Sequence, residues 1–135
     1  MTITNQIGYK DFKGTELSDE ILASSNYEMV SITIDSDCRD TGNTGITGML
    51  RRGLILYYDT TDDNYKELDT GATQSASAVV LAEPVPNMDT FTGPVIAKAY
   101  YKGTFKHGKL INNSGDFDPD LCHRISIRDN VGTGT

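Results

Sequence analysis

The sequence predicts a mainly β protein: one compact β-rich domain with little helix and an extended N-terminal arm. Short apolar runs alternate with polar residues at a period of two, which is typical of half-buried strands. Clusters of Gly, Asp, Asn and Pro separate these runs and indicate turns. The helix signal is limited to "SDEILAS", where Ser18 is a candidate N-cap. A chain of 135 residues is naturally one domain, and it can bury enough surface to fold without a metal or disulfide.

The first predicted strands lie in the first half of the chain. In "YEMVSITID", residues 27–35, Val30, Ile32 and Ile34 share one face, so the segment is expected to be a strand with one buried side. "LILYYD", residues 54–59, is followed by turn residues and then by "YKEL", residues 65–68. This order predicts a hairpin with a longer loop.

Three further strands are expected in the second half. "SASAVVLAEPV", residues 75–85, indicates a small-residue strand whose open edge a neighbouring copy would cover. In "PVIAKAYYKG", residues 94–103, alternation places Val95, Ala97, Ala99 and Tyr101 on one face. Gly103 is expected to end or bulge this strand before "TFKHG" continues it. The alternation of Ile125 and Ile127 with polar residues predicts the last strand.

The two ends differ from the middle of the chain. Residues 1–26 show no sustained period and are interpreted as an extended N-terminal arm. Residues 129–135, "DNVGTGT", are rich in Gly and Thr and are expected to form a flexible tail. The β-rich domain is therefore predicted to span residues 27–128.

Charge and composition exclude several partners. The 19 acidic residues outnumber the 12 basic ones, which gives a formal net charge of -7 and a pI near 4.6. That charge repels nucleic acid and anionic lipid, so neither is an expected partner. No apolar run reaches the ~20 residues that span a bilayer, and the N-terminus has no signal-peptide pattern. Cys38 and Cys122 are expected to be reduced, packed residues.

Two Asp-Thr-Gly segments raise the possibility of a protease. Residues 67–75, "ELDTGATQS", match the active-site loop of retroviral-type aspartic proteases, and Asp40-Thr41-Gly42 repeats the motif. Such an enzyme would be a homodimer in which Asp69 shares a proton with its symmetry mate. The downstream loop has Pro where that fold needs Gly, and Asp and Gly are also ordinary turn residues. The interpretation that the chain is not an enzyme is therefore favoured, with the protease as an alternative.

Metal sites are not predicted either. Asp116, Asp118 and Asp120 spell the start of a calcium loop, but the Gly and the final Glu of that loop are missing. Cys38, Cys122 and the two histidines lack the spacing of a zinc site. No cofactor is expected.

One long segment carries a family resemblance. "GITGMLRRGLILYYDTTDDNYKELDTGATQSASAVVLAEPV" gives a Gly-rich lead-in, the Arg52-Gly53 step, a strand, a hairpin, an Asp-Gly turn and a small-residue strand. "GPVIAKAYYKGTFKHGKL" then adds an apolar strand with an aromatic-Lys-Gly-Thr-Phe step. This order resembles the head decoration proteins of tailed bacteriophages. The resemblance covers residues 45–111, about half of the chain.

The resemblance implies a structural virion protein with a β-tulip or barrel-like fold. Proteins of this family form homotrimers at three-fold and quasi-three-fold sites of the expanded capsid and stabilise it. The implied partner is the major capsid protein, and the implied location is the outer surface of a virion made in the host cytoplasm. "YEMVSITID" would be an additional strand. Another virion attachment or fibre domain is an alternative that shares the acidic, β-rich character.

The resemblance also assigns a role to the N-terminal arm, which in this family pairs with capsid strands. An added strand gains main-chain hydrogen bonds, and alternate side chains fill pockets. The apolar or extended-favouring residues of the arm are the expected capsid-binding residues: Thr2, Ile3, Ile7, Tyr9 and Phe12. The alternative is that these side chains cover the protein's own core.

Overall fold

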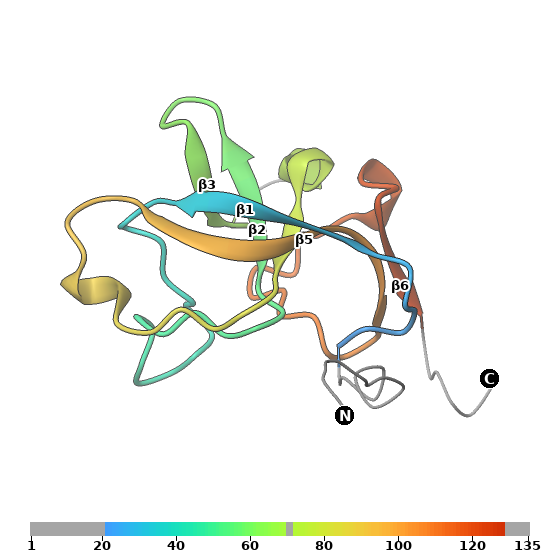
Figure 1. The fold of residues 1–135 in the computed structure, drawn as a ribbon, viewed down its shortest axis with the longest axis horizontal. Coiled ribbons are helices and arrows are strands. Elements are labelled where there is room, and N and C mark those ends of the chain that lie inside the picture. Colours follow the sequence, from blue (N-terminus) through green and yellow to red (C-terminus); the bar gives the residue numbers. More distant parts are fainter. Residues whose placement is uncertain (1–20, 70–71, 129–135) are drawn as a thin grey trace, which may run out of the picture.

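The structure, a computed structural model, describes residues 21–69 and 72–128. Its strands are β1 (Glu28–Ile34), β2 (Ile55–Asp59), β3 (Asn64–Glu67), β4 (Val79–Leu81), β5 (Val95–Lys106) and β6 (Ile125–Arg128). Within the described residues, helix is limited to the 3-10 turns η1 (Ala72–Ser77), η2 (Met88–Thr90) and η3 (Pro119–Leu121). The predicted class, a mainly β single domain with little helix, is confirmed (Figure 1).

Five of the strands close into a ring. The sheet order is β1-β3-β2-β4-β5-β6, and β1 also pairs with β5. The long β1–β5 pairing is antiparallel and runs from Glu28↔Lys102 to Ile34↔Val95. The β1–β3 pairing is parallel and consists of the single register Ile34↔Tyr65. β6 lies outside the ring, parallel to the second half of β5. The expected strand "YEMVSITID" is thus the element that closes the ring.

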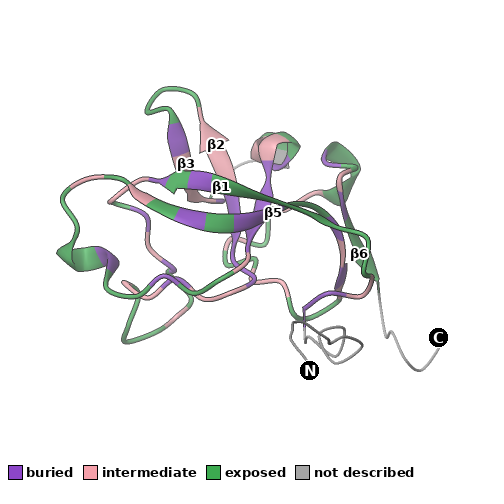
Figure 2. Ribbon diagram, in the orientation of Figure 1, coloured by how far each residue is buried: buried purple, intermediate pink, exposed green. Residues whose placement is uncertain are grey.

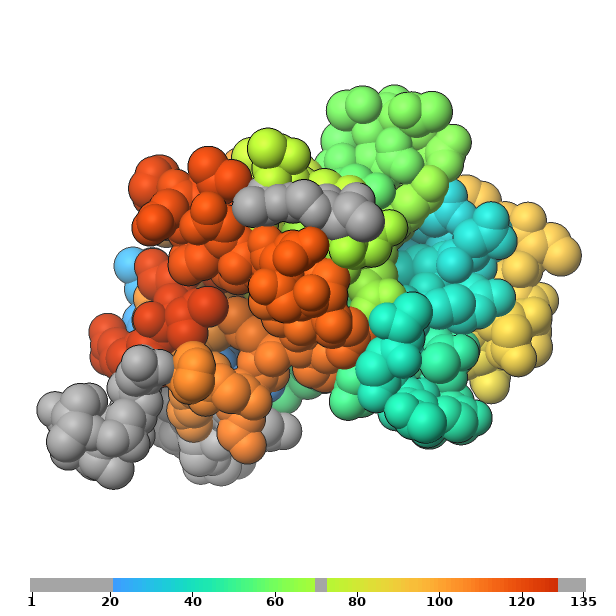
Figure 3. All heavy atoms as spheres, turned by 180° about the vertical axis from the view of Figure 1, so that it is seen from behind, coloured from blue at the N-terminus to red at the C-terminus, as the bar shows by residue number. Residues whose placement is uncertain are grey.

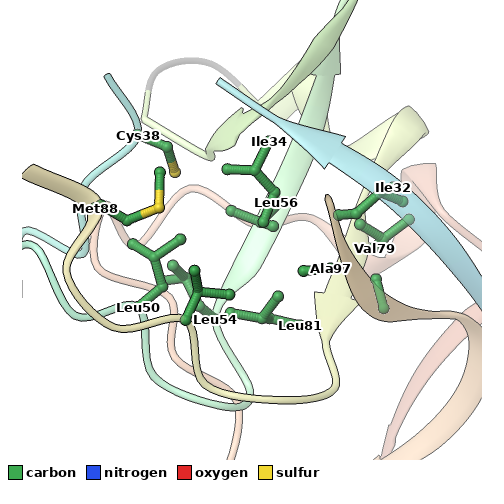
Figure 4. Close-up of a cluster of buried hydrophobic side chains, with 12 residues drawn as sticks. Ile32, Ile34, Cys38, Leu50, Leu54, Leu56, Val79, Leu81, Met88 and Ala97 are labelled. Carbon is green, nitrogen blue, oxygen red and sulfur yellow. The ribbon is translucent and has the colours of Figure 1, made fainter. Parts of the chain in front are cut away.

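The wall of the ring is buried on both sides at β4, where successive side chains of the strand point to opposite faces and all are covered. On β4, Val79 and Leu81 point to one side and Val80 to the other, and all three are fully buried. The first side is the inner core (Figure 4), formed by Ile32, Ile34, Cys38, Leu50, Leu54, Leu56, Val79, Leu81, Val85, Met88, Ala97 and Ala99. The second is the outer core, formed by Ile21, Leu22, Ile55, Leu68, Ala78, Val80, Tyr100, Phe105, Cys122 and Ile125.

The β2–β3 hairpin and the segment after β5 extend beyond the two cores. The predicted hairpin is confirmed, because β2 and β3 pair antiparallel from Leu56↔Glu67 to Asp59↔Asn64. Seen from behind, the hairpin tip projects above the molecule, and the segment after β5 spreads across that face (orange to red in Figure 3). That segment pairs with the ring at the bridge Leu54↔Ile111.

The small-residue strand differs from the prediction. Only Val79–Leu81 is strand, and residues 72–77 form η1. β4 pairs with β2 on one side and β5 on the other, so it has no open edge for a neighbouring copy. The expectation of an exposed edge in this segment was wrong, because the strand is central rather than peripheral.

Along β5, the side chains of alternate residues switch from one face of the sheet to the other at Tyr101. Ala97 and Ala99 point into the inner core as expected, and buried and exposed residues alternate along this part of β5 (Figure 2). Phe105, however, belongs to the outer core together with Tyr100, and Tyr101 is exposed. The register against β1 shifts here, since Met29 pairs with Tyr100 and Glu28 with Lys102. One extra residue on β5 reverses the alternation. The irregularity therefore lies at Tyr101, and β5 continues through Gly103 without ending.

The N-terminal boundary of the domain lies before residue 27. Ile21 and Leu22, predicted to belong to the arm, are buried in the outer core. Backbone N–H groups link this segment to β5, from Ala23 to the Thr104 carbonyl at 2.9 Å and from Lys106 to the Ile21 carbonyl at 2.9 Å. The arm residues Thr2, Ile3, Ile7, Tyr9 and Phe12, and the tail 129–135, lie outside the described residues.

Candidate functional site

The Asp40 carboxylate is the centre of a buried polar cluster. Its side chain is fully buried and receives four hydrogen bonds. Arg51 donates from its backbone N at 3.1 Å, from Nε at 2.8 Å and from Nη2 at 3.0 Å. Asn113 donates from Nδ2 at 2.7 Å. The carboxylate therefore ties the loop before β2 to the segment after β5.

These partners also decide the ionisation of Asp40. Burial by itself would raise the pKa of this carboxyl, but the hydrogen bonds from Arg51 and Asn113 outweigh burial and lower the pKa. Each of the two Asp40 carboxylate oxygens accepts two hydrogen bonds. The ionised carboxylate therefore has no remaining acceptor site for a water that it could activate. Gly42 permits the close approach of Asn113, because a Cβ at that position would collide with its side chain.

Asp69 occupies the second Asp-Thr-Gly segment in a different way. It is exposed, and it exchanges hydrogen bonds with Gln74, from the Asp69 backbone N to Oε1 at 3.1 Å and from Nε2 to the Asp69 Oδ1 at 3.0 Å. This clasp spans the entry to η1. Among the described residues, Asp69 is thus hydrogen-bonded to the Gln74 side chain of η1, and its predicted role in the turn involves residues 70 and 71, which lie outside the described residues.

Glu67 brings the two segments together, which the sequence did not predict. Its Oε2 accepts the Thr41 hydroxyl at 3.2 Å and a hydrogen bond from Asn113. Thr41, Glu67 and Asp69 line one shallow depression of about 370 Å³. The two Asp-Thr-Gly segments are thus neighbours, yet Asp40 points inward onto Arg51 rather than toward a second carboxylate.

The candidate metal ligands are held apart or used locally. Asp118 caps η3, since its side chain accepts the backbone N–H of Asp120 at 3.0 Å. Its own backbone N–H donates to the Ser75 hydroxyl at 2.9 Å. Residues 21–69 and 72–128 contain no group of three or more ligands that could hold a metal ion.

Both cysteines are buried free thiols in different cores. Cys38 lies in the inner core and Cys122 in the outer core. Burial raises the pKa of the Cys38 thiol to about 12, so this sulfur stays protonated at neutral pH. They are packed residues, as the sequence predicted.

The outer face of β1 and β5 carries the most exposed apolar side chain of the described part of the chain. Ile96 is 76% exposed and lies opposite Thr33 on β1. Met29, on the same face, is 44% exposed, and Tyr27 beside it packs edge-on against Tyr100 at 5.4 Å. No described helix is long and apolar enough to cross a membrane.

The fold and the polar cluster define a small β-barrel protein whose buried carboxylate has a structural role. No family model matches the chain, and no curated protein matches it either.

Proposed function

We infer that the chain is a structural virion protein that decorates the expanded capsid of a tailed phage and stabilises it. It binds as homotrimers at three-fold and quasi-three-fold sites, with the major capsid protein as partner, on the outer surface of the virion. In this proposal it has no catalytic activity, needs no cofactor, and contacts neither nucleic acid nor membrane.

One observation carries the proposal: the segments that resemble head decoration proteins form one continuous wall. Residues 45–111 supply β2, β3, β4 and β5, which pair in the order β3-β2-β4-β5. The Arg52-Gly53 step lies one residue before β2, and Gly53 has a positive φ of +97° that favours glycine. The conspicuous carboxylates of the described residues have structural partners, which favours a binding protein over the protease alternative.

The proposal assigns capsid attachment to the N-terminal residues. The chain enters the domain at Ile21 and Leu22, whose burial anchors the base of the arm beside β5. Residues that precede this anchor are proposed to add a strand to a capsid edge, with Thr2, Ile3, Ile7, Tyr9 and Phe12 as contacts. The ordering cost of such a segment, roughly 1–2 kcal/mol per residue, is offset by contacts made only on the shell.

The test is binding to expanded, undecorated heads of the phage that encodes the protein. Electron cryomicroscopy should show trimeric density at the three-fold positions with the whole chain. A chain lacking residues 2–13 should remain folded but bind far more weakly, while one lacking residues 129–135 serves as the matched truncation control and should bind fully. Absence of binding by the whole chain, or a monomer or dimer on the particle, would refute the proposal. Pepstatin-sensitive cleavage that is lost in Asp69→Asn would favour the protease instead.

A further inference from the structure

The ring is weakly closed between β1 and β3, and this leaves a strand edge open. Asp35 donates its backbone N–H to the Tyr65 carbonyl at 2.9 Å, next to the single β1–β3 register at Ile34. Before Ile34, the edge of β1 that faces away from β5 has no strand partner among residues 21–69 and 72–128. Figure 1 shows the β2–β3 hairpin rising away from β1 on this side.

A groove of about 450 Å³ follows this open edge, here called the β1 groove. Residues 30–33 of β1 form one wall, and the hairpin forms the other. Tyrosine rings line it from both β5 and the hairpin, and Tyr58 and Tyr65 pack edge-on at 5.4 Å. Val30 is 36% exposed and Tyr101 39% exposed, so apolar surface is uncovered inside the groove.

A polar group of the same groove lacks a partner. Asn64 is 7% exposed, and its Oδ1 accepts no hydrogen bond from the described residues. Buried amide oxygens are nearly always paired in proteins, because an unpaired one costs about 1–3 kcal/mol.

The charge at the hairpin end of the groove is acidic. Lys66 lies 2.7 Å from the Asp59 carboxylate, 2.5 Å from Asp62 and 4.0 Å from Asp35, and Asp63 lines the groove itself. Three carboxylates therefore surround the Lys66 ammonium, and Asp63, whose carboxylate accepts a hydrogen bond from the Tyr58 hydroxyl, adds a further acidic group in the groove itself. This excess favours a basic side chain from the ligand at that end. It disfavours a second copy of this chain, which would bring the same carboxylates and a net charge of -7.

The opposite side of the groove is fixed by Arg124. Its guanidinium lies 4.1 Å from the centre of the Tyr101 ring and donates to the Tyr101 carbonyl at 2.6 Å. This contact holds Tyr101 in place as part of the groove wall. The groove thus has a preformed apolar floor, an open strand edge and a single acidic end.

We propose that the open edge of β1, residues 28–33, is a strand-addition site for an extended segment of a partner protein. The segment is apolar at alternate positions and carries a Lys or Arg where it meets the β2–β3 hairpin. Main-chain hydrogen bonds to β1 provide affinity, and the tyrosine-lined groove selects the apolar side chains. The site is independent of the proposed capsid function, since it uses the folded domain and not the N-terminal residues.

The test is a display selection in which random heptapeptides are selected for binding to the whole wild-type chain. Peptides that also bind the Val30→Lys protein are removed. Lys at this half-exposed position fills the groove and repels a basic ligand. The matched control is Ile96→Lys, which places the same charge on the outer face of β5, where Ile96 is already 76% exposed. Enriched peptides should alternate apolar residues and carry an excess of Lys or Arg, and they should bind wild type and Ile96→Lys at least tenfold tighter than Val30→Lys.

Nuclear magnetic resonance of the labelled chain then maps the site. The best peptide should shift the amides of residues 28–33 and 63–65, and methylating its alternate backbone nitrogens should weaken binding at least tenfold. Asp63→Asn, which suits the positive φ of 57° at this position, should weaken the basic peptide severalfold. Equal binding to Val30→Lys, equal binding of the methylated peptide, or enrichment of acidic peptides would overturn the proposal. So would shifts of residues 28–33 that grow with protein concentration alone, since they would make a second copy the occupant.

Discussion

At the scale of single residues, two aspartates with the same neighbours in sequence have opposite environments. Asp40 is buried and accepts four hydrogen bonds, while Asp69 is exposed and contacts Gln74. We expect Asp40→Asn to lower the free energy of unfolding by about 2 kcal/mol, because the amide cannot accept all four donors of Arg51 and Asn113. Asp69→Asn is the matched control and should change stability by less than about 0.5 kcal/mol. Urea denaturation measures both, and equal effects would contradict the structural role of Asp40.

The lowered pKa of Asp40 also predicts a pH dependence. Because the folded-state pKa lies below the unfolded value near 3.8, the stabilisation is fully present above pH 4 or so. It is lost as the pH falls further, through the folded-state pKa. The difference in unfolding free energy between wild type and Asp40→Asn should therefore be constant from about pH 7 to 5 and shrink below about pH 4. A difference that grows on acidification would mean that the folded protein does not favour the ionised form.

The thiols provide a second prediction at this scale. Cys38 and Cys122 are buried in separate cores, and burial raises the pKa of Cys38 to about 12. Neither thiol should react with a thiolate-directed reagent at pH 8 in the folded protein, and both should react after unfolding. Ser25→Cys, at an exposed position, is the positive control. Rapid labelling of the native wild type would show that one of these sulfurs is accessible.

At the scale of elements, the step into β2 depends on Gly53. Its backbone N–H donates to the Leu81 carbonyl at 2.8 Å, and its carbonyl accepts from the Ile111 N–H at 2.9 Å. Gly53 therefore links β4 to the segment after β5. Its φ is +97°, and a Cβ here would lie 2.7 Å from the Lys109 carbonyl oxygen. This oxygen belongs to the backbone and cannot move aside as a flexible side chain would.

We expect Gly53→Ala to destabilise the protein more than Gly45→Ala. Gly45 has a similar φ of +89°, but a Cβ added there would meet no atom within 4 Å, so its substitution costs only backbone strain, about 1–3 kcal/mol. Gly53→Ala adds the overlap with Lys109, a further ~1–3 kcal/mol. Thermal unfolding of the two variants isolates this overlap. Equal melting temperatures would mean that the segment around Lys109 shifts freely.

At the scale of the whole molecule, two cores share one wall, and the segment at Ile21 and Leu22 closes the outer one. Leu22→Ala should therefore lower the free energy of unfolding by about 2–5 kcal/mol, a large part of the stability of a small domain. Leu121→Ala is the control, because Leu121 is 43% exposed and should cost less than about 1 kcal/mol. Denaturant titration compares them. If Leu22→Ala left the free energy of unfolding unchanged, the domain would begin at residue 27, as the sequence predicted.

The local pattern of the sequence was enough for the class of fold. Alternation predicted β1 and the last strand, because a period of two is a property of each strand by itself. An apolar run followed by turn residues predicted the hairpin of β2 and β3. Residue types also predicted that both cysteines are packed, since this depends on local polarity.

Only the tertiary structure decided what each segment faces. "SASAVVLA" is central because β2 and β5 pair on its two sides, and β5 changes face at Tyr101 because of its register against β1. The partner of Asp40 across the molecule is Asn113, 73 positions away, and no local pattern signals such a pair. The edge of β1 is open because β3 of the hairpin pairs with it only at Ile34, and this pairing depends on the tertiary structure. The sequence by itself indicated where most strands lie, whereas pairing between distant segments determined how far the small-residue strand extends and which surface each strand buries.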